Sequence, residues 1–361
     1  MATQVSRLPF LSFVARAARL ATLQCPAFCL LLSPAPAFAA QSPCDQAEAQ
    51  VREGKRLTDA KQYPLAVEKL RSALAACPES KAAALELTRA YVESRQYADA
   101  ERAASSVLAR DPRSEPAQFL LAYSYFMQQR FPEAGETLKK LVAQDNRNAD
   151  AHKLMGLTLF FYKQDVMAEE QLRIALRLRP ADVEARYYLG RVYYTQNNFA
   201  PAVAAFRRVI ELDRQHYKAY DNLGLCYEAM NKPLEALAAF KRAQEIARQV
   251  DPSYEWPYTN LAEMLIKEDR TAEALPYAQE AVRVNPQSAR ANYLAGKVLS
   301  RQAKLDEARP YLERAASLDP KYAEPHYLLG QLYEKLGRHE DAAREFALFE
   351  KLRQEIPQRP R

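Results

Sequence analysis

Apolar and small residues recur along this chain with a period of 34 residues, from Ala47 to Ile356. One position is Leu or Met in most rows of the repeat. The next position is small in every row, where it holds Gly54, Thr88, Ala122, Gly156, Gly190, Gly224, Ala262, Gly296 and Gly330. Another position is always alanine, at Ala66, Ala100, Ala134, Ala168, Ala202, Ala236, Ala274, Ala308 and Ala342. A repeat of this length indicates a stacked array of small units rather than a globule built around one active site.

Each row predicts two amphipathic helices separated by a short polar break. In the fifth row, apolar residues recur at spacings of three, four and seven within residues 183–196 and again within 199–212. Several second helices open with proline, which suits the first turn of a helix. The pattern therefore predicts nine helix-turn-helix units, at residues 47–80, 81–114, 115–148, 149–182, 183–216, 217–254, 255–288, 289–322 and 323–356. The register breaks once, where the four residues Asp251–Tyr254 are inserted and should lengthen the preceding helix by about one turn.

The small position has a packing interpretation. Two antiparallel helices approach closely only where bulky side chains are absent, so the small residue is expected to face the constant alanine of the second helix. A bulky position in the second helix is expected to fill the space between units. It holds Leu70, Leu138, Leu172, Phe206, Phe240, Leu312 and Phe346.

Taken together, these positions resemble the tetratricopeptide repeat. The family pattern of Leu-Gly, Tyr, Ala and an aromatic residue appears in the fifth row as Leu189-Gly190, Tyr193, Ala202 and Phe206. The tryptophan that opens the family pattern is absent. The resemblance implies an all-α fold, an α-solenoid in which nine helix-turn-helix units form a right-handed superhelix. It also implies a concave groove, lined by first helices, that binds peptides or partner proteins.

The first 40 residues differ from the array. Three arginines, Arg7, Arg16 and Arg19, precede the apolar stretch 20–32, and small residues at 37 and 39 fit a secretory cleavage site. We expect residues 1–40 to be a signal peptide, 41–356 the repeat array and 357–361 a tail. Export to a periplasmic or extracellular location follows. The alternative is a mitochondrial presequence, since no acidic residue precedes Asp45. The apolar stretch is too short for a membrane span, so none is expected in the mature chain.

Two cysteines flank the first unit. Cys44 lies just before its first helix and Cys77 at the end of its second. Antiparallel helices bring these two ends together, so a Cys44–Cys77 disulfide is a candidate, with two free buried thiols as the alternative. A disulfide would fit an oxidising compartment outside the cytoplasm.

The sequence offers little for catalysis. None of the four histidines has a second histidine or a cysteine at metal-ligand spacing, and phosphate-loop and nucleophile motifs are absent. We therefore expect no enzymatic activity, no cofactor and no metal. The formal net charge is +6, and the basic residues alternate with acidic ones along helix faces. Nucleic acid is accordingly not an expected partner.

The family resemblance implies which positions line the groove. The candidate partner-binding residues are Phe119, Tyr123, Phe126, Lys153, Phe160, Tyr187, Arg191, Tyr194, Asn222, Asn260, Tyr293 and Lys297. Their aromatic content is typical of protein recognition surfaces, although packing between units is the alternative explanation. In superhelical members of the family, asparagine at the position of Asn222 and Asn260 binds the backbone of an extended peptide.

The sequence thus predicts a non-enzymatic scaffold that binds a protein or peptide, with assembly of an envelope complex as one specific role. Two alternatives remain open. A tyrosine-rich groove also suits a carbohydrate-binding or polysaccharide-export accessory factor, and the chain suits the non-catalytic subunit of an enzyme complex. Self-association through the C-terminal helix is a further expectation, because Phe349, Leu352 and Ile356 lack a following unit.

Overall fold

The computed structural model describes residues 42–355, which form eighteen α-helices and no β-strand. The first helices of the nine units are α1 (Pro43–Asp59), α3 (Lys81–Glu93), α5 (Glu115–Met127), α7 (Ala149–Phe161), α9 (Val183–Thr195), α11 (Tyr217–Ala229), α13 (Trp256–Lys267), α15 (Ala289–Arg301) and α17 (Ala323–Lys335). The second helices are α2 (Tyr63–Ala76), α4 (Tyr97–Arg110), α6 (Phe131–Gln144), α8 (Asp165–Leu178), α10 (Phe199–Leu212), α12 (Pro233–Val250), α14 (Thr271–Val284), α16 (Leu305–Leu318) and α18 (His339–Glu355). The all-α prediction is confirmed. The expected signal peptide, the tail and Ile356 lie outside the described residues.

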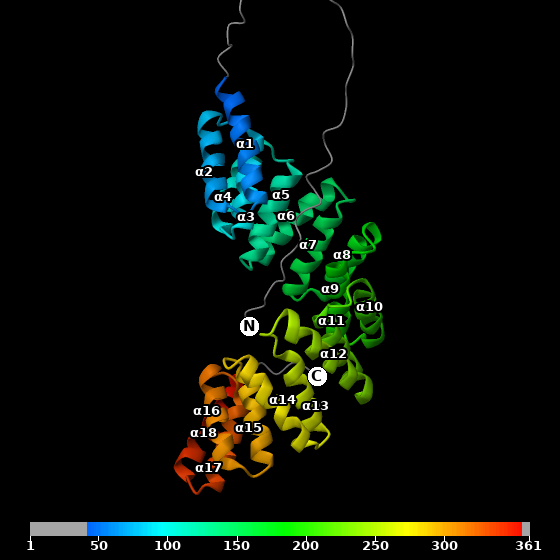
Figure 1. Ribbon diagram of the computed structural model, residues 1–361, viewed down its shortest axis with the longest axis vertical. Helices are drawn as coiled ribbons and strands as arrows, with labels where there is room; N and C mark the ends of the chain where they lie inside the picture. Colours follow the sequence, from blue (N-terminus) through cyan, green and yellow to red (C-terminus); the bar gives the residue numbers. More distant parts are fainter. Residues whose placement is uncertain (1–41, 356–361) are drawn as a thin grey trace, which may run out of the picture. The chain divides into compact units, whose positions relative to one another are not determined.

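The helices stack in chain order, each against the next (Figure 1). Each first helix also contacts the first helix of the following unit, whereas no two second helices within residues 42–355 are in contact. The odd-numbered helices α3 to α17 therefore form one continuous side of the array, which we call the first-helix face. This is the α-solenoid that the repeat predicts.

In six of the nine described units, a glycine of the first helix lies against a bulky residue of the second helix. A Cβ atom on Gly190 of α9 would lie 2.7 Å from Cε1 of Phe206 in α10, closer than real Cβ atoms come to a neighbour. The same spacing of sixteen residues joins the other pairs, which are Gly54–Leu70, Gly156–Leu172, Gly224–Phe240, Gly296–Leu312 and Gly330–Phe346. The expectation that the small position faces the constant alanine holds at Gly296, where the carbonyl oxygen of Ala308 lies 3.3 Å from the Cβ position, but at all six glycines the nearest atom belongs to the bulky residue. The bulky side chain lies inside its own unit, against the glycine, because only the missing Cβ leaves room for it.

The turn between the two helices of a unit has the same conformation throughout. In the fifth unit, Asn197 has a φ of 60°, and the N–H of Asn198 donates to the carbonyl of Tyr193 at 2.8 Å. This left-handed residue and its six-to-one hydrogen bond are the Schellman ending of a helix. The equivalent positive-φ residues are Lys61, Arg95, Gln129, Lys163, Asn231, Asp269, Ala303 and Gly337. Only one of them is glycine, so this turn could not be recognised from the residue types at its left-handed position.

The register break lengthens α12. This helix has 18 residues, whereas the second helices before and after it, α10 and α14, have 14 each. Four residues correspond to about one helical turn, so the expected lengthening is confirmed.

The first unit carries a covalent link. Cys44, in the first turn of α1, forms a disulfide with Cys77, which follows α2, and their Cα atoms are 4.9 Å apart. The predicted pairing is confirmed. It closes the terminal unit, which has a neighbour on one side only, and in the chain-entropy model a loop of this length stabilises the folded state by about 4 kcal/mol. Cys226 is a buried free thiol.

The end of the array is more covered than the sequence suggested. Leu352 of α18 is only 7% exposed, and the ring of Phe349 lies 5.0 Å from that of Tyr327 in α17. Leu352 is therefore buried although the sequence places no further unit after it. Self-association through this helix stays a prediction.

The glycine contacts predict how two similar substitutions will differ. Gly190→Ala should lower the stability of the array by about 1–3 kcal/mol, because the new Cβ collides with a fully buried phenylalanine. Gly135→Ala in α6 is the matched control, since no atom lies within 4 Å of its Cβ position. That variant should gain up to about 1 kcal/mol of helix propensity. Urea unfolding followed by circular dichroism measures both, and equal effects of the two changes would contradict this packing.

Candidate binding site on the first-helix face

A connected series of aromatic rings runs along the first-helix face from α5 to α9. Phe126 contacts Phe161 with ring centroids 5.7 Å apart, Phe161 contacts Phe160 at 5.3 Å, and Phe160 contacts Tyr188 at 5.6 Å. Tyr187 continues the series at 5.4 Å from Tyr188. The rings meet edge to face, the geometry that aromatic pairs favour. Three neighbouring units are thus joined by one aromatic layer.

Most of these rings are buried already in the single chain. Phe126 is 2% exposed, Phe160 4% and Tyr187 8%, and Tyr123 and Tyr293 are buried as well. Neighbouring first helices are in direct contact, so rings at these positions fill the space between units. A partner would reach little of them, and their role in binding stays a prediction. The other candidates, Phe119, Lys153, Arg191, Tyr194, Asn222 and Lys297, are half-buried, whereas Asn260 is buried.

Several basic side chains lie over aromatic rings on this face, and three of them have no ion-pair partner among the described residues. The Arg191 guanidinium is 4.7 Å from the ring centre of Phe160, and the Lys297 ammonium is 5.3 Å from that of Tyr293. Lys218 was not among the predicted residues, and its ammonium lies 5.5 Å from the ring of Tyr217. In the part of the chain that the structure describes, no carboxylate comes within 4.0 Å of any of these three cations. Burial lowers the pKa of Lys218 and of Lys297, and neighbouring positive charges add to the effect.

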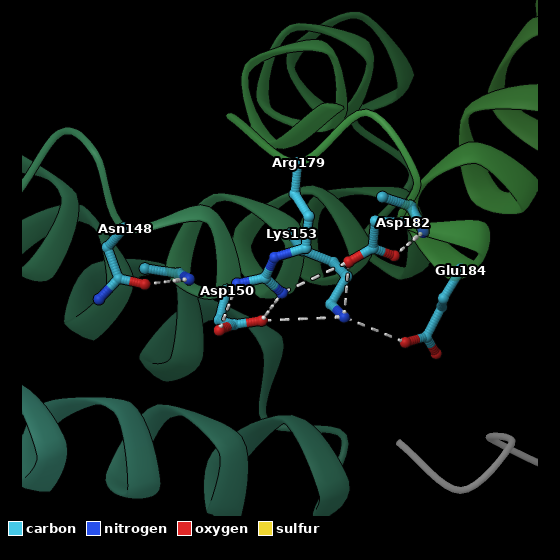
Figure 2. Close-up of polar contacts among 8 residues, drawn as sticks. Asn148, Asp150, Lys153, Arg179, Asp182 and Glu184 are labelled. Atoms are coloured by element: carbon cyan, nitrogen blue, oxygen red, sulfur yellow. Dashed lines mark hydrogen bonds and ion pairs between the residues drawn. The ribbon is translucent and has the colours of Figure 1, made fainter. Parts of the chain in front are cut away.

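Lys153 behaves differently, because it is neutralised within the chain (Figure 2). Its Nζ atom lies 3.1 Å from Oδ2 of Asp182 and 3.6 Å from Oε2 of Glu184. Arg179 makes two hydrogen bonds to Asp150, of 2.7 and 3.0 Å, in the same cluster. The cluster ties α7 to α8 and α9. Lys153, which the sequence analysis assigned to partner binding, is therefore already paired with carboxylates of its own chain.

Glu184 is the member of this cluster with the most altered acidity. Burial raises the pKa of its carboxyl to about 7, and Lys153 opposes the shift without cancelling it. A buried carboxylate loses its hydration, and one ammonium group at 3.6 Å replaces only part of it.

The two asparagines with an implied role in peptide binding make hydrogen bonds inside the chain. Asn222 donates to the hydroxyl of Tyr187 at 3.2 Å and to the carbonyl of Lys218 at 2.8 Å. Asn260 donates to Asp221 at 2.9 Å and accepts a hydrogen bond from Arg290 at 3.1 Å. Both amides therefore fix the contacts between first helices, and their role in binding a peptide backbone stays a prediction.

The inserted residues Asp251–Tyr254 are attached to α11, which sequence reasoning missed. The Tyr254 hydroxyl donates to Oδ2 of Asp221 at 2.9 Å, and the Tyr217 hydroxyl donates to Oδ2 of Asp251 at 2.7 Å. Burial raises the pKa of Asp221 to about 6, against the lowering effect of the hydrogen bonds from Tyr254 and Asn260. The only sequence signal for this arrangement is the break in register.

Comparison with known families agrees with the helix pattern. Models described as tetratricopeptide repeat match residues 91–157, 217–287, and 168–215 with 293–358, which together cover well over half of the chain. The chain belongs to the tetratricopeptide repeat family. No curated protein matches the sequence.

Similar solved structures show the same fold. The Cut9–Hcn1 hetero-tetramer of the APC/C matches with a TM-score of 0.57 and 13% identity, over 80% of this chain and 54% of that chain. A tetratricopeptide repeat protein from Parabacteroides merdae matches with a TM-score of 0.55 and 15% identity, over 70% of this chain and 98% of that one. PilF from Pseudomonas aeruginosa matches with a TM-score of 0.50 and 22% identity, over 60% and 96% of the two chains. At these identities the likeness concerns the fold alone.

Two further observations concern residues 42–355 of this tetratricopeptide repeat protein. None of their helices combines the length and the apolar character that crossing a membrane requires. Their histidine, cysteine and acidic side chains form no group of three or more that is arranged to hold a metal ion. The buried His152 makes hydrogen bonds with Gln171 at 2.8 Å and with the carbonyl of Asn146 at 3.2 Å, which gives it a structural role.

The acidity of Glu184 predicts a pH-dependent stability difference. The folded pKa of about 7 is above the ordinary value of 4.5, so the folded state holds this proton more tightly than the unfolded state does. The free energy of unfolding should therefore fall, relative to that of Glu184→Gln, as the pH rises from about 5 to about 8. We expect a relative change of about 1–3 kcal/mol. Urea unfolding of both proteins across this range measures it, and a difference that does not change with pH would contradict the assignment.

Proposed function

We propose that this protein is an exported, non-enzymatic scaffold that binds a protein or peptide partner on its first-helix face. Membership of the tetratricopeptide repeat family supports the scaffold role. The arginine-containing, apolar leader and the Cys44–Cys77 disulfide support a location outside the cytoplasm. Assembly of an envelope complex is the specific role that we favour, with a periplasmic location.

One observation carries the choice of surface. Arg191, Lys218 and Lys297 are held over aromatic rings on the first-helix face, and within the described residues no carboxylate oxygen lies within 4.0 Å of their charged nitrogens. Half-buried cations that are fixed by packing lose little side-chain entropy when they bind a partner. A surface that presents them in three units is suited to recognition rather than to packing alone.

The carbohydrate alternative has less support. Stacking on a sugar requires an exposed ring face, but Phe160, Tyr187 and Tyr188 are each less than 9% exposed, and Arg191 covers the ring of Phe160. Among the described first helices, the clearly exposed rings are Trp256 and Tyr327, and Arg290 lies over the ring of Trp256. The remaining alternative, a non-catalytic subunit of an enzyme complex, uses the same surface and differs only in the identity of the partner.

Site-specific crosslinking tests the proposed surface. A photoreactive amino acid at Tyr194, half-buried on α9, should crosslink a protein partner in the cells that produce this chain. The matched control carries the same amino acid at Leu234, which is 77% exposed on the second helix α12. We expect a discrete adduct at position 194 and none at position 234. No adduct at either position, or the same adduct at both, would contradict the proposal.

A further inference from the structure

We propose that Arg191 and Lys218, together with the inserted residues Asp251–Tyr254, form a binding site for carboxylate groups of an acidic polypeptide segment. We call this the Arg191–Lys218 site. The inference rests on the proposed function and deepens it, because it names the chemistry of the partner and the residues that select it.

The insertion builds one wall of the site. The rings of Tyr217 and Tyr254 meet edge to face with centroids 4.8 Å apart, and the Lys218 ammonium lies 5.5 and 5.9 Å from their ring centres. Hydrogen bonds from Tyr254 to Asp221 and from Tyr217 to Asp251 hold both rings in place. Without the insertion there would be no Tyr254 beside α11. The one irregularity of the repeat thus positions a cation on the first-helix face.

Arg191 supplies the second positive charge. Its guanidinium lies over the rings of Phe160 and Tyr188, and its helix α9 is in contact with α11, which carries Lys218. Burial is the main cause that lowers the pKa of Lys218, and the charge of Arg191 adds a smaller effect. Asp251 has the opposite effect on Lys218, but its carboxylate is more than 4.0 Å away and accepts a hydrogen bond from Tyr217. Two half-buried cations that repel each other are stabilised by an anion between or beside them.

Other cations on the same face have carboxylate partners in the chain. Lys267 of α13 lies 2.8 Å from Glu228, and Arg290 of α15 is paired with Glu263. Lys153 is enclosed by Asp182 and Glu184. The lack of such a partner at Arg191 and Lys218 is therefore local, and the missing negative charge is what a ligand would supply.

Among the classes of ligand, an acidic polypeptide fits this site best. Sugars and nucleic-acid bases stack on open ring faces, whereas the rings here are buried or covered by the two cations. Acidic side chains need only reach the charged groups at the surface. Lys297 over Tyr293 repeats the arrangement further along the first-helix face, so a segment with several carboxylates can use both positions.

Binding of fluorescein-labelled poly-L-glutamate to the purified mature protein tests the site. The double variant Arg191→Gln/Lys218→Gln should bind at least about tenfold more weakly in fluorescence anisotropy. The control Arg208→Gln/Arg242→Gln removes the same charge from exposed positions on α10 and α12, where Arg208 pairs with Glu211 and Arg242 with Glu245. The control should change the dissociation constant by less than about twofold. Equal weakening in both variants, or no weakening in the first, would overturn the proposal.

Two further measurements test the class of ligand and the role of the insertion. Polygalacturonate, an acidic polysaccharide, should compete less well than unlabelled poly-L-glutamate for the site, and stronger competition would overturn the choice of a polypeptide.

Tyr217→Phe/Tyr254→Phe keeps both rings and every charge but removes the two hydroxyls whose hydrogen bonds hold the rings. It should reduce the affinity by several-fold, and unchanged affinity would overturn the role of the insertion. If position 194 still yields its crosslink but poly-L-glutamate binds the Arg191→Gln/Lys218→Gln variant as tightly as it binds the unmodified protein, the acidic-ligand inference is wrong. The scaffold proposal then stands.

Discussion

The close approach of the two helices in each unit is the constraint on which the rest of the structure depends. A glycine in the first helix removes the only atom that would collide with a large side chain sixteen residues later, and that side chain is fully buried at Phe206 and Phe240. Glycine costs up to about 1 kcal/mol of helix propensity relative to alanine. Burying a phenylalanine or leucine side chain stabilises the folded state by about 1.5–3 kcal/mol, which is more than the helix-propensity cost of the glycine. In the second unit the larger side chain is on the first helix, where Thr88 replaces the glycine, and the smaller Ala104 lies sixteen residues later.

This packing separates structural positions from positions that are available for binding. Within a unit, the glycine and the bulky residue fill the interior. Between units, first helices are in direct contact, through buried aromatic rings from α5 to α9, whereas the backbones of the second helices within residues 42–355 stay apart. Charged groups on the first helices then lie above these rings, half-buried and fixed. The function that we propose uses these charged groups, and the rings serve as their support.

Much of the fold could be predicted because the period records which side of each helix is apolar. The nine helix pairs, the longer α12 and the Cys44–Cys77 disulfide all follow from spacing along the chain. The partner of the small position could not be predicted, since a period shows that a residue is buried but not which neighbour it meets. The left-handed turn between the two helices could not be predicted either. Glycine would have indicated it, but residues such as Lys61, Asp269 and Ala303 occupy the left-handed position.

The site was predicted only in part, for a related reason. Aromatic residues at the expected groove positions gave the same pattern whether they bind a partner or fill the space between units, and Phe126, Phe160 and Tyr187 are buried. The ion pairs of Lys153 and the hydrogen bond from Tyr254 to Asp221 join residues about thirty positions apart, so local sequence carries no sign of them.

The central claim is that a partner contacts the first helices around the insertion. Hydrogen–deuterium exchange of the mature protein, with and without saturating poly-L-glutamate, tests it most directly. The account predicts slower exchange in α9, α11 and residues 251–254, with no change in the second helices α8 and α10. Protection confined to second helices, or no protection anywhere in the chain while the ligand is bound, would contradict it.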